Sequence, residues 1–139
     1  MPRKDIFHET VITSLEKEGW QIIDDPLRIV AGGVGLFIDL TAEPIITFKR
    51  DNERVAIEIK SFQIQSQITT FYEALGKYLT YRKALSMNNL GLDLYLAVPK
   101  ESFDTIFQKE LVKELVKEYR VNLLVYNTKN QTVESWITQ

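Results

Sequence analysis

The chain contains no cysteine among its 139 residues. A disulfide framework, a cysteine-based zinc site and a thiol nucleophile are therefore excluded, and the absence fits a reducing compartment. Histidine is almost as scarce, because His8 is the only one, and a single imidazole cannot build a metal site by itself. We expect His8 to have a structural or helix-capping role.

Long hydrophobic runs and an excess of basic charge are also missing. No apolar stretch approaches the roughly 18 residues of a membrane span, and the N-terminal segment mixes polar and apolar residues. The sequence therefore predicts a cytoplasmic protein with no membrane association. The formal net charge is −2, so no overall basic field indicates nucleic-acid binding. Local basic patches would have to supply nucleic-acid binding, and the candidates are residues 49–54 and the helix face with Lys77, Arg82 and Lys83. The alternatives are that residues 49–54 are a solvated loop and that the helix face is simply exposed to solvent.

The length fits one domain over residues 1–139, and no linker, repeat or low-complexity stretch divides it. Apolar residues at helical spacing predict helices near residues 7–19, 66–86 and 102–119. Strands are predicted at residues 20–23, 27–30, 36–41, 45–49, 54–60, 92–98, 121–126 and 132–137. A mixed meander followed by helix, strand, helix, strand is typical of an α/β fold.

Several elements have a predicted role in this arrangement. Residues 45–49 and 54–60 flank a polar turn and form a hairpin. The run 92–98 is apolar throughout, which indicates a strand covered on both faces, and 132–137 is expected at a sheet edge. Helix 66–86 places Tyr78 in its core stripe. Helix 102–119 is expected to face the core with Ile106, Phe107, Leu111, Leu115 and Val116.

Two opposite charges stand inside the predicted strand 54–60, in the tripeptide Glu58-Ile59-Lys60. Side chains alternate along a strand, so Glu58 and Lys60 share one face with Ala56, while Ile59 points the other way. With 12 Glu and 11 Lys in the chain, about one Glu-x-Lys is expected by chance. The strand setting, and not the tripeptide itself, therefore indicates a function.

A second carboxylate, Asp39, belongs to the predicted strand 36–41. If it lies beside Glu58, the two acids can bind Mg²⁺ or Mn²⁺, which prefer oxygen ligands, with the Ile59 carbonyl as a third ligand. Lys60 can then hold the attacking water or a phosphate as a point charge. Asp39, Glu58 and Lys60 together would suit phosphodiester cleavage.

Two alternatives remain open at this stage. Glu58 and Lys60 can form a cross-strand ion-pair ladder with Lys49 and Asp39 as partners, a common arrangement that contributes only about 0–1 kcal/mol. Glu43, just before a proline, competes with Asp39 for the position of the second acid.

Other candidates are weaker. Glu9 on the first helix can join a metal shell or be a solvated helix residue. Gln63 and Gln65 follow the tripeptide and can contact phosphates or base edges, although polar residues at a turn need no such role. Arg82 lies among tyrosines and can contact DNA, but a core helix is the alternative. Gly32-Gly33-Val34-Gly35 is not followed by a helix, so a dinucleotide-binding loop is not indicated.

The order of helix, meander with Asp39, then Glu58-Ile59-Lys60 and a long helix resembles the PD-(D/E)xK nuclease superfamily. A closer resemblance covers nearly the whole chain, from Lys4 to about Ile137: the chain is similar to the XisH family of cyanobacterial fdxN element excision controlling factors. The segments that carry this resemblance are Lys4-Asp5-Ile6-Phe7-His8, Gly19-Trp20, Asp25-Pro26-Leu27-Arg28-Ile29, Leu36-Phe37-Ile38-Asp39-Leu40 with Glu43, Glu58-Ile59-Lys60-Ser61-Phe62, Ala74-Leu75-Gly76, Tyr81-Arg82 and Leu94-Tyr95-Leu96-Ala97-Val98-Pro99.

The resemblance implies a restriction-endonuclease-like core, that is, a central mixed β-sheet flanked by helices. It also implies a DNA-linked role beside a site-specific recombinase and a small companion protein, XisI. The sequence leaves open whether the chain forms a homodimer. Ile38 stands where the superfamily motif has proline before its acid, and a factor that controls excision need not itself cut DNA. A metal-dependent endonuclease and a non-cleaving accessory protein are therefore both compatible with the sequence.

Overall fold

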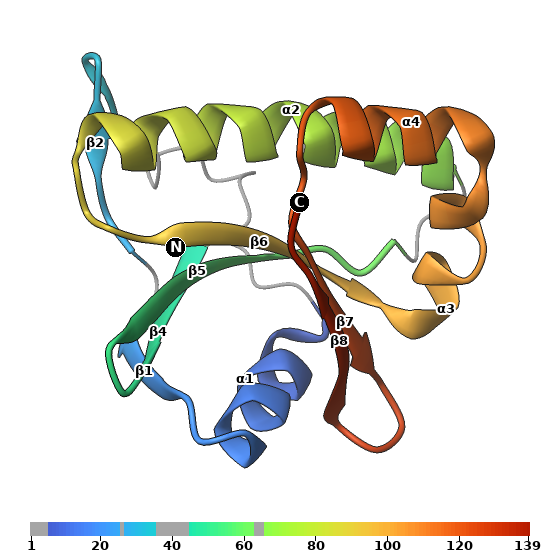
Figure 1. Ribbon diagram of the computed structural model, residues 1–139, viewed down its shortest axis with the longest axis horizontal. Coiled ribbons are helices and arrows are strands. Elements are labelled where there is room, and N and C mark those ends of the chain that lie inside the picture. The colour runs from blue at the N-terminus through green and yellow to red at the C-terminus, as the bar shows by residue number, and fades with distance from the viewer. Residues whose placement is uncertain (1–5, 26, 36–44, 63–65) are drawn as a thin grey trace.

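The computed structural model describes residues 6–25, 27–35, 45–62 and 66–139 (Figure 1). Its helices are α1 (His8–Lys17), α2 (Gln67–Met87), α3 (Lys100–Phe103), η1 (Ile106–Gln108, a 3-10 helix) and α4 (Glu110–Glu118). Its strands are β1 (Gln21–Asp24), β2 (Val30–Ala31), β3 (Val34–Gly35), β4 (Ile45–Arg50), β5 (Glu53–Ile59), β6 (Asp93–Pro99), β7 (Leu123–Asn127) and β8 (Thr132–Ile137). None of the described helices is long and apolar enough to cross a membrane.

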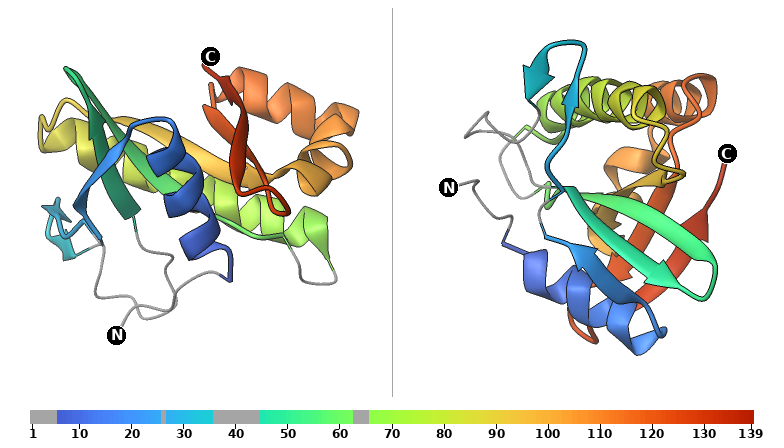
Figure 2. Two further views of the ribbon diagram at one scale, coloured as in Figure 1. Left: turned by 90° about the horizontal axis from the view of Figure 1, so that it is seen from below. Right: turned by 90° about the vertical axis from the view of Figure 1, so that its left-hand side faces the viewer.

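Six strands form one mixed sheet in the order β1-β4-β5-β6-β7-β8. The pairs β5–β6 and β6–β7 are parallel, and the other pairs are antiparallel. Both parallel crossovers run in the same direction across the sheet, so crossovers of one hand bring α2 and α4 to the same face (Figure 1). Figure 2 shows α1 on the opposite face, with the sheet between the two layers. The predicted α/β class with a central mixed sheet flanked by helices is confirmed, and β8 lies at the sheet edge as predicted.

The alternation of side chains along the strands divides the core in two. On the face toward α2 and α4, Ala56 of β5 joins a cluster with Phe71 and Tyr78 of α2. On the other face, Ile57 joins a cluster with Val11 of α1. Residues 94–99 of β6 are all buried, as expected for a central strand that is covered on both faces.

Helix α2 matches its prediction closely. Ser66 caps it, because the Ser66 side chain accepts a hydrogen bond from the Thr69 amide at 3.3 Å. Tyr78 is fully buried, as its place in the apolar stripe predicts. Helix α1 begins at His8, and Phe7 stands at the N-cap position without a side-chain cap. Asp5, which precedes the predicted start of this helix, lies outside the described residues.

The single helix predicted over residues 102–119 is wrong. The chain instead forms α3, η1 and α4, with breaks at Thr105 and at Lys109, whose backbone is extended (φ −68°, ψ 137°). Thr105 contributes to the first break, because its hydroxyl donates to the Glu101 carbonyl at 2.8 Å in competition with the helix ladder. The break shifts the helical phase, so Leu111, predicted inward, is 57% exposed, while Val112 is fully buried.

Two shorter segments also differ from the prediction. Residues 27–30 do not form one strand: β2 pairs with β3 in a small separate hairpin around Gly32 and Gly33, both with positive φ. The turn between β4 and β5 contains only Asp51 and Asn52, and Asp51 has a φ of 55°. The strand predicted at 36–41 lies outside the described residues.

Candidate functional site

Glu58 is a fully buried carboxylate in the middle of the sheet, with 0% of its surface exposed. It lies on β5, opposite Ile45 of β4 and beside Leu96 of β6. Ala56, two residues earlier, belongs to the apolar cluster beneath α2. The carboxylate is therefore directed to the α2 side of the sheet, on the face that the strand alternation predicts.

Tyr78 of α2 interacts electrostatically with Glu58. Burial raises the pKa of the Tyr78 phenol above its usual 10.0, although the Asn122 amide and Arg82 lower it, and the Glu58 carboxylate adds the smallest contribution, which also raises it. The phenol donates to the Leu94 carbonyl at 2.9 Å and accepts from the Asn122 amide at 3.0 Å. Helix α2 is thus tied to β6 and to the start of β7 next to the buried carboxylate.

The other two groups of the tripeptide lie at the carboxyl end of β5. The Lys60 amide donates to the Ala97 carbonyl of β6 at 3.1 Å, and the Lys60 side chain is half-buried. Within a trans peptide the carbonyl points opposite to the amide, so the Ile59 carbonyl points away from β6 and past Ile45, where the described part of β4 begins. The Ile59 side chain is buried on the α1 face.

The donor groups around Glu58 suit a divalent metal ion. A carboxylate and a backbone carbonyl at one strand end are donors that suit Mg²⁺ or Mn²⁺, and a buried carboxylate is a typical ligand of such an ion. Within residues 6–25, 27–35, 45–62 and 66–139, no three or more His, Asp or Glu residues are grouped so that they could hold a metal ion. The predicted second acid, Asp39, and its competitor Glu43 lie outside these ranges, so their place beside Glu58 stays a prediction.

The alternative ion-pair ladder with Lys49 does not form. Lys49 lies opposite Arg54, near the turn of the hairpin, whereas Glu58 lies opposite Ile45 at its far end. The two-residue turn sets this register. Glu58 and Lys49 are therefore separated by most of the length of β4.

Of the weaker candidates, Glu9 and Arg82 belong to the described residues, and they lie on different helices. Glu9 is exposed in the first turn of α1. Arg82 of α2 donates to the carbonyls of Tyr119 and Arg120 at 2.7 and 3.0 Å, where it caps the C-terminal end of α4. Gln63 and Gln65 lie outside the described residues. DNA contact by Arg82 stays a prediction, although its guanidinium has this structural role.

His8 is 2% exposed, and its Nε2 atom lies 3.0 Å from Oδ2 of Asp25. The pair joins the start of α1 to the end of β1. This buried contact supports the structural role that we expect for His8.

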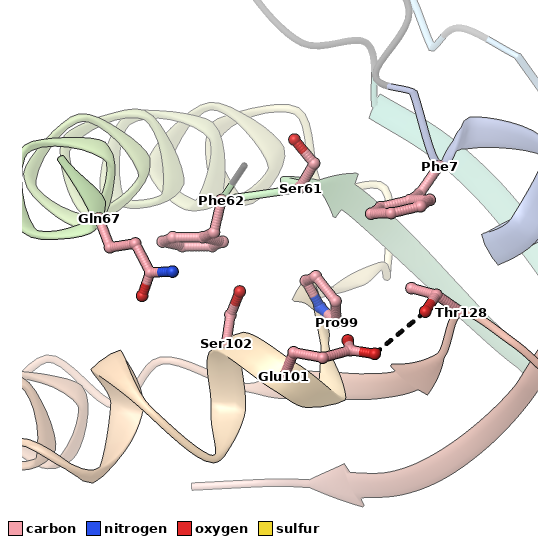
Figure 3. A pocket seen from close by; sticks show the side chains of 8 residues that line it. All are labelled: Phe7, Ser61, Phe62, Gln67, Pro99, Glu101, Ser102 and Thr128. Atoms are coloured by element: carbon pink, nitrogen blue, oxygen red, sulfur yellow. Dashed lines mark hydrogen bonds between the residues drawn. The ribbon is translucent and has the colours of Figure 1, made fainter. Parts of the chain in front are cut away.

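A cavity at the carboxyl ends of the parallel strands was missed by sequence reasoning (Figure 3). It has a volume of about 410 Å³. Side chains from five segments line it, among them Phe7, Phe62, Gln67, Glu101, Ser102 and Thr128. Ligands of open α/β sheets bind outside the carboxyl ends of the strands, and this rule is the signal that could have found it.

Comparison with known proteins places these features in a family. The model of the XisH protein family matches residues 1–134. The chain is 40% identical to an XisH family protein from Nostoc punctiforme PCC 73102, whose crystal structure matches with a TM-score of 0.88 over 96% of this chain and 100% of that one. It is 41% identical to a fdxN element excision controlling factor protein from Anabaena variabilis, with a TM-score of 0.88 over 96% of this chain and 99% of that one. No curated protein matches the chain significantly.

Proposed function

The chain belongs to the XisH family, and we propose that it controls the excision of a DNA element through a metal site of the PD-(D/E)xK nuclease type. The similar Anabaena variabilis protein is described as an excision controlling factor of the fdxN element. The observation that carries the proposal is the fully buried Glu58 carboxylate near the carboxyl end of β5. Lys60 follows two residues later, where strand alternation predicts the same face.

Asp39, Glu58 and Lys60 have different roles in the proposed phosphodiester cleavage. Asp39 and Glu58 would hold a Mg²⁺ or Mn²⁺ ion, with the Ile59 carbonyl as a third ligand. When bound, the ion neutralises phosphate charge and activates a water. Lys60 positions that water or the scissile phosphate by its positive charge, which the apolar surroundings of β5 screen less than bulk water does.

The test is a nicking assay on supercoiled, linear and branched DNA with Mg²⁺ or Mn²⁺. Wild-type protein nicks DNA only with metal, and Lys60→Ala abolishes nicking while the thermal unfolding midpoint stays close to that of wild type. Lys49→Ala is the matched control, because Lys49 is an exposed lysine at the other end of the same hairpin. Wild-type protein that is inert on all three DNA forms, with the XisI-type companion present, would refute cleavage.

A second candidate function follows from the charge of the chain. A net charge of −2 and a pI near 5.5 disfavour a stand-alone DNA binder, which usually has a basic surface. In this case the protein is a non-cleaving accessory factor that binds an XisI-type companion and helps a site-specific recombinase. Excision would then survive Glu58→Gln. Loss of excision in a folded Glu58→Gln protein that still binds its companion would contradict this second function.

A further inference from the structure

The cavity at the carboxyl ends of β5, β6 and β7 lies directly beyond the proposed cleavage site. Ser61, which lines it, is the next residue after Lys60. Phe62 follows with a φ of 58°, a left-handed conformation that is strained for an aromatic residue and that turns its ring toward Phe107 under the cavity. Through Ser61 and Phe62, the cavity adjoins the segment that carries Lys60. Its volume of about 410 Å³ is within the range of small-molecule sites.

The lining has the character of a site for an uncharged, flat group. None of the described residues that line it is a lysine or an arginine, and Glu101 contributes a carboxylate, which would repel a phosphate. Phe7 and Phe62 supply aromatic surface at opposite sides of the opening (Figure 3). Hydroxyl and amide groups supply the hydrogen-bonding capacity between them.

Three polar groups face the cavity, and hydrogen bonds orient two of them. Thr128 donates to Glu101 Oε1 at 3.1 Å, which holds this carboxylate at the rim. Gln67 Oε1 accepts a long hydrogen bond from Thr105 at 3.4 Å, so the Gln67 amide nitrogen is turned toward the cavity (Figure 3). Ser102 is only 4% exposed, its hydroxyl points into the cavity, and this hydroxyl makes no hydrogen bond within the described part of the chain.

We propose that this cavity binds an unpaired nucleobase that carries an exocyclic amino group. Glu101 accepts from the amino group, Gln67 donates to a ring nitrogen or carbonyl of the base, and Ser102 completes the contacts. Phe7 contacts the face of the base. Because the ligand is part of a DNA strand, the inference rests on the proposed function and names the form of DNA that the site prefers.

The test measures fluorescence anisotropy of labelled single-stranded oligo-dC and oligo-dT with the full chain, with Ca²⁺ in place of Mg²⁺. Cytosine has the amino group and thymine does not, while ring size and charge are the same. Wild-type protein binds oligo-dC about tenfold more tightly. Glu101→Gln lowers this ratio to less than about threefold, and Ser102→Ala lowers it as well. Glu114→Gln, an exposed glutamate on α4, leaves the ratio unchanged.

Each outcome separates the cavity from the cleavage site. A preference for oligo-dC without nicking supports the cavity and refutes cleavage. Nicking with equal affinity for both oligonucleotides overturns the cavity proposal alone. Failure to bind either oligonucleotide also overturns it and points to a partner polypeptide as the occupant. Thermal unfolding of Ser102→Ala and Glu101→Gln close to wild type shows that a lost preference is not a loss of folding.

Discussion

Replacing Tyr78 by phenylalanine should weaken the fold at the point where α2 holds the Glu58 face of the sheet. The phenol is fully buried and makes two hydrogen bonds, to the Leu94 carbonyl and from the Asn122 amide. Phenylalanine keeps the ring and its packing but removes the hydroxyl. The substitution therefore isolates the two hydrogen bonds from the apolar contacts of the ring.

The two lost bonds are not equivalent. The Leu94 carbonyl keeps a hydrogen bond from the side-chain nitrogen Nδ2 of Asn122 at 3.2 Å, whereas the backbone N–H of Asn122 loses its partner. We expect a loss of about 2 kcal/mol in the free energy of unfolding, most of it because the buried backbone N–H of Asn122 is left without an acceptor. For a chain of this length, this corresponds to a decrease of about 8 °C in the unfolding midpoint. Tyr72→Phe on the same helix is the control: Tyr72 is 53% exposed, and we expect a change below about 0.5 kcal/mol.

The same substitution has a pH signature. Because burial raises the pKa of Tyr78 above 10.0, the folded state keeps the phenol proton at pH values where the unfolded chain releases it. The stability that the phenol contributes is thus fully present below pH 10.0 and is lost as the pH rises through the folded pKa. Chemical denaturation of both proteins across this range should show the difference in stability narrowing above pH 10.0. If Tyr78→Phe destabilises the protein no more than Tyr72→Phe does, the buried hydrogen bonds of the phenol do not contribute as expected. A stability difference between wild type and Tyr78→Phe that widens with pH would contradict the raised pKa of Tyr78.

Two further predictions concern the packing of α4 and the contact between His8 and Asp25. Val112→Ala should lower the free energy of unfolding by about 2 kcal/mol because Val112 is fully buried, whereas Leu111→Ala should change it by less than about 0.5 kcal/mol. Urea denaturation measures both values. The reverse order would support the single helix predicted from the sequence. Asp25→Ala should cost about 1 kcal/mol by removing the acceptor of the buried His8, and a double-mutant cycle with His8→Ala should give a coupling of similar size; zero coupling would contradict the pair.

Local signals predicted most of the fold. Ser66 and the apolar spacing after it define α2, and the alternation in β5 gives the correct face for Glu58, because both are properties of a few consecutive residues. The helix over 102–119 was wrong for the opposite reason. Apolar spacing can continue across a break, and the extended backbone at Lys109 that resets the phase has no strong breaker such as proline or glycine at that position.

The candidate site was predictable only in part. The Glu58 and Lys60 pairing on one face follows from their two-residue spacing, but the exclusion of Lys49 as a partner depends on the length of the turn, which the sequence left open. The cavity joins residues as distant in the chain as Phe7 and Thr128. Only the order of strands in the sheet brings such residues together, and no local pattern encodes it.

The proposed function requires Asp39 and Glu58 to share one divalent metal ion. Crystals of the wild-type protein soaked in Mn²⁺ test this directly through the anomalous difference map. We expect a peak within coordinating distance, about 2.1 Å, of oxygens of both side chains, and no peak in the isomorphous Glu58→Gln protein. A map without a peak beside Glu58, or Asp39 and Glu58 carboxylates directed to opposite faces of the sheet, would contradict it.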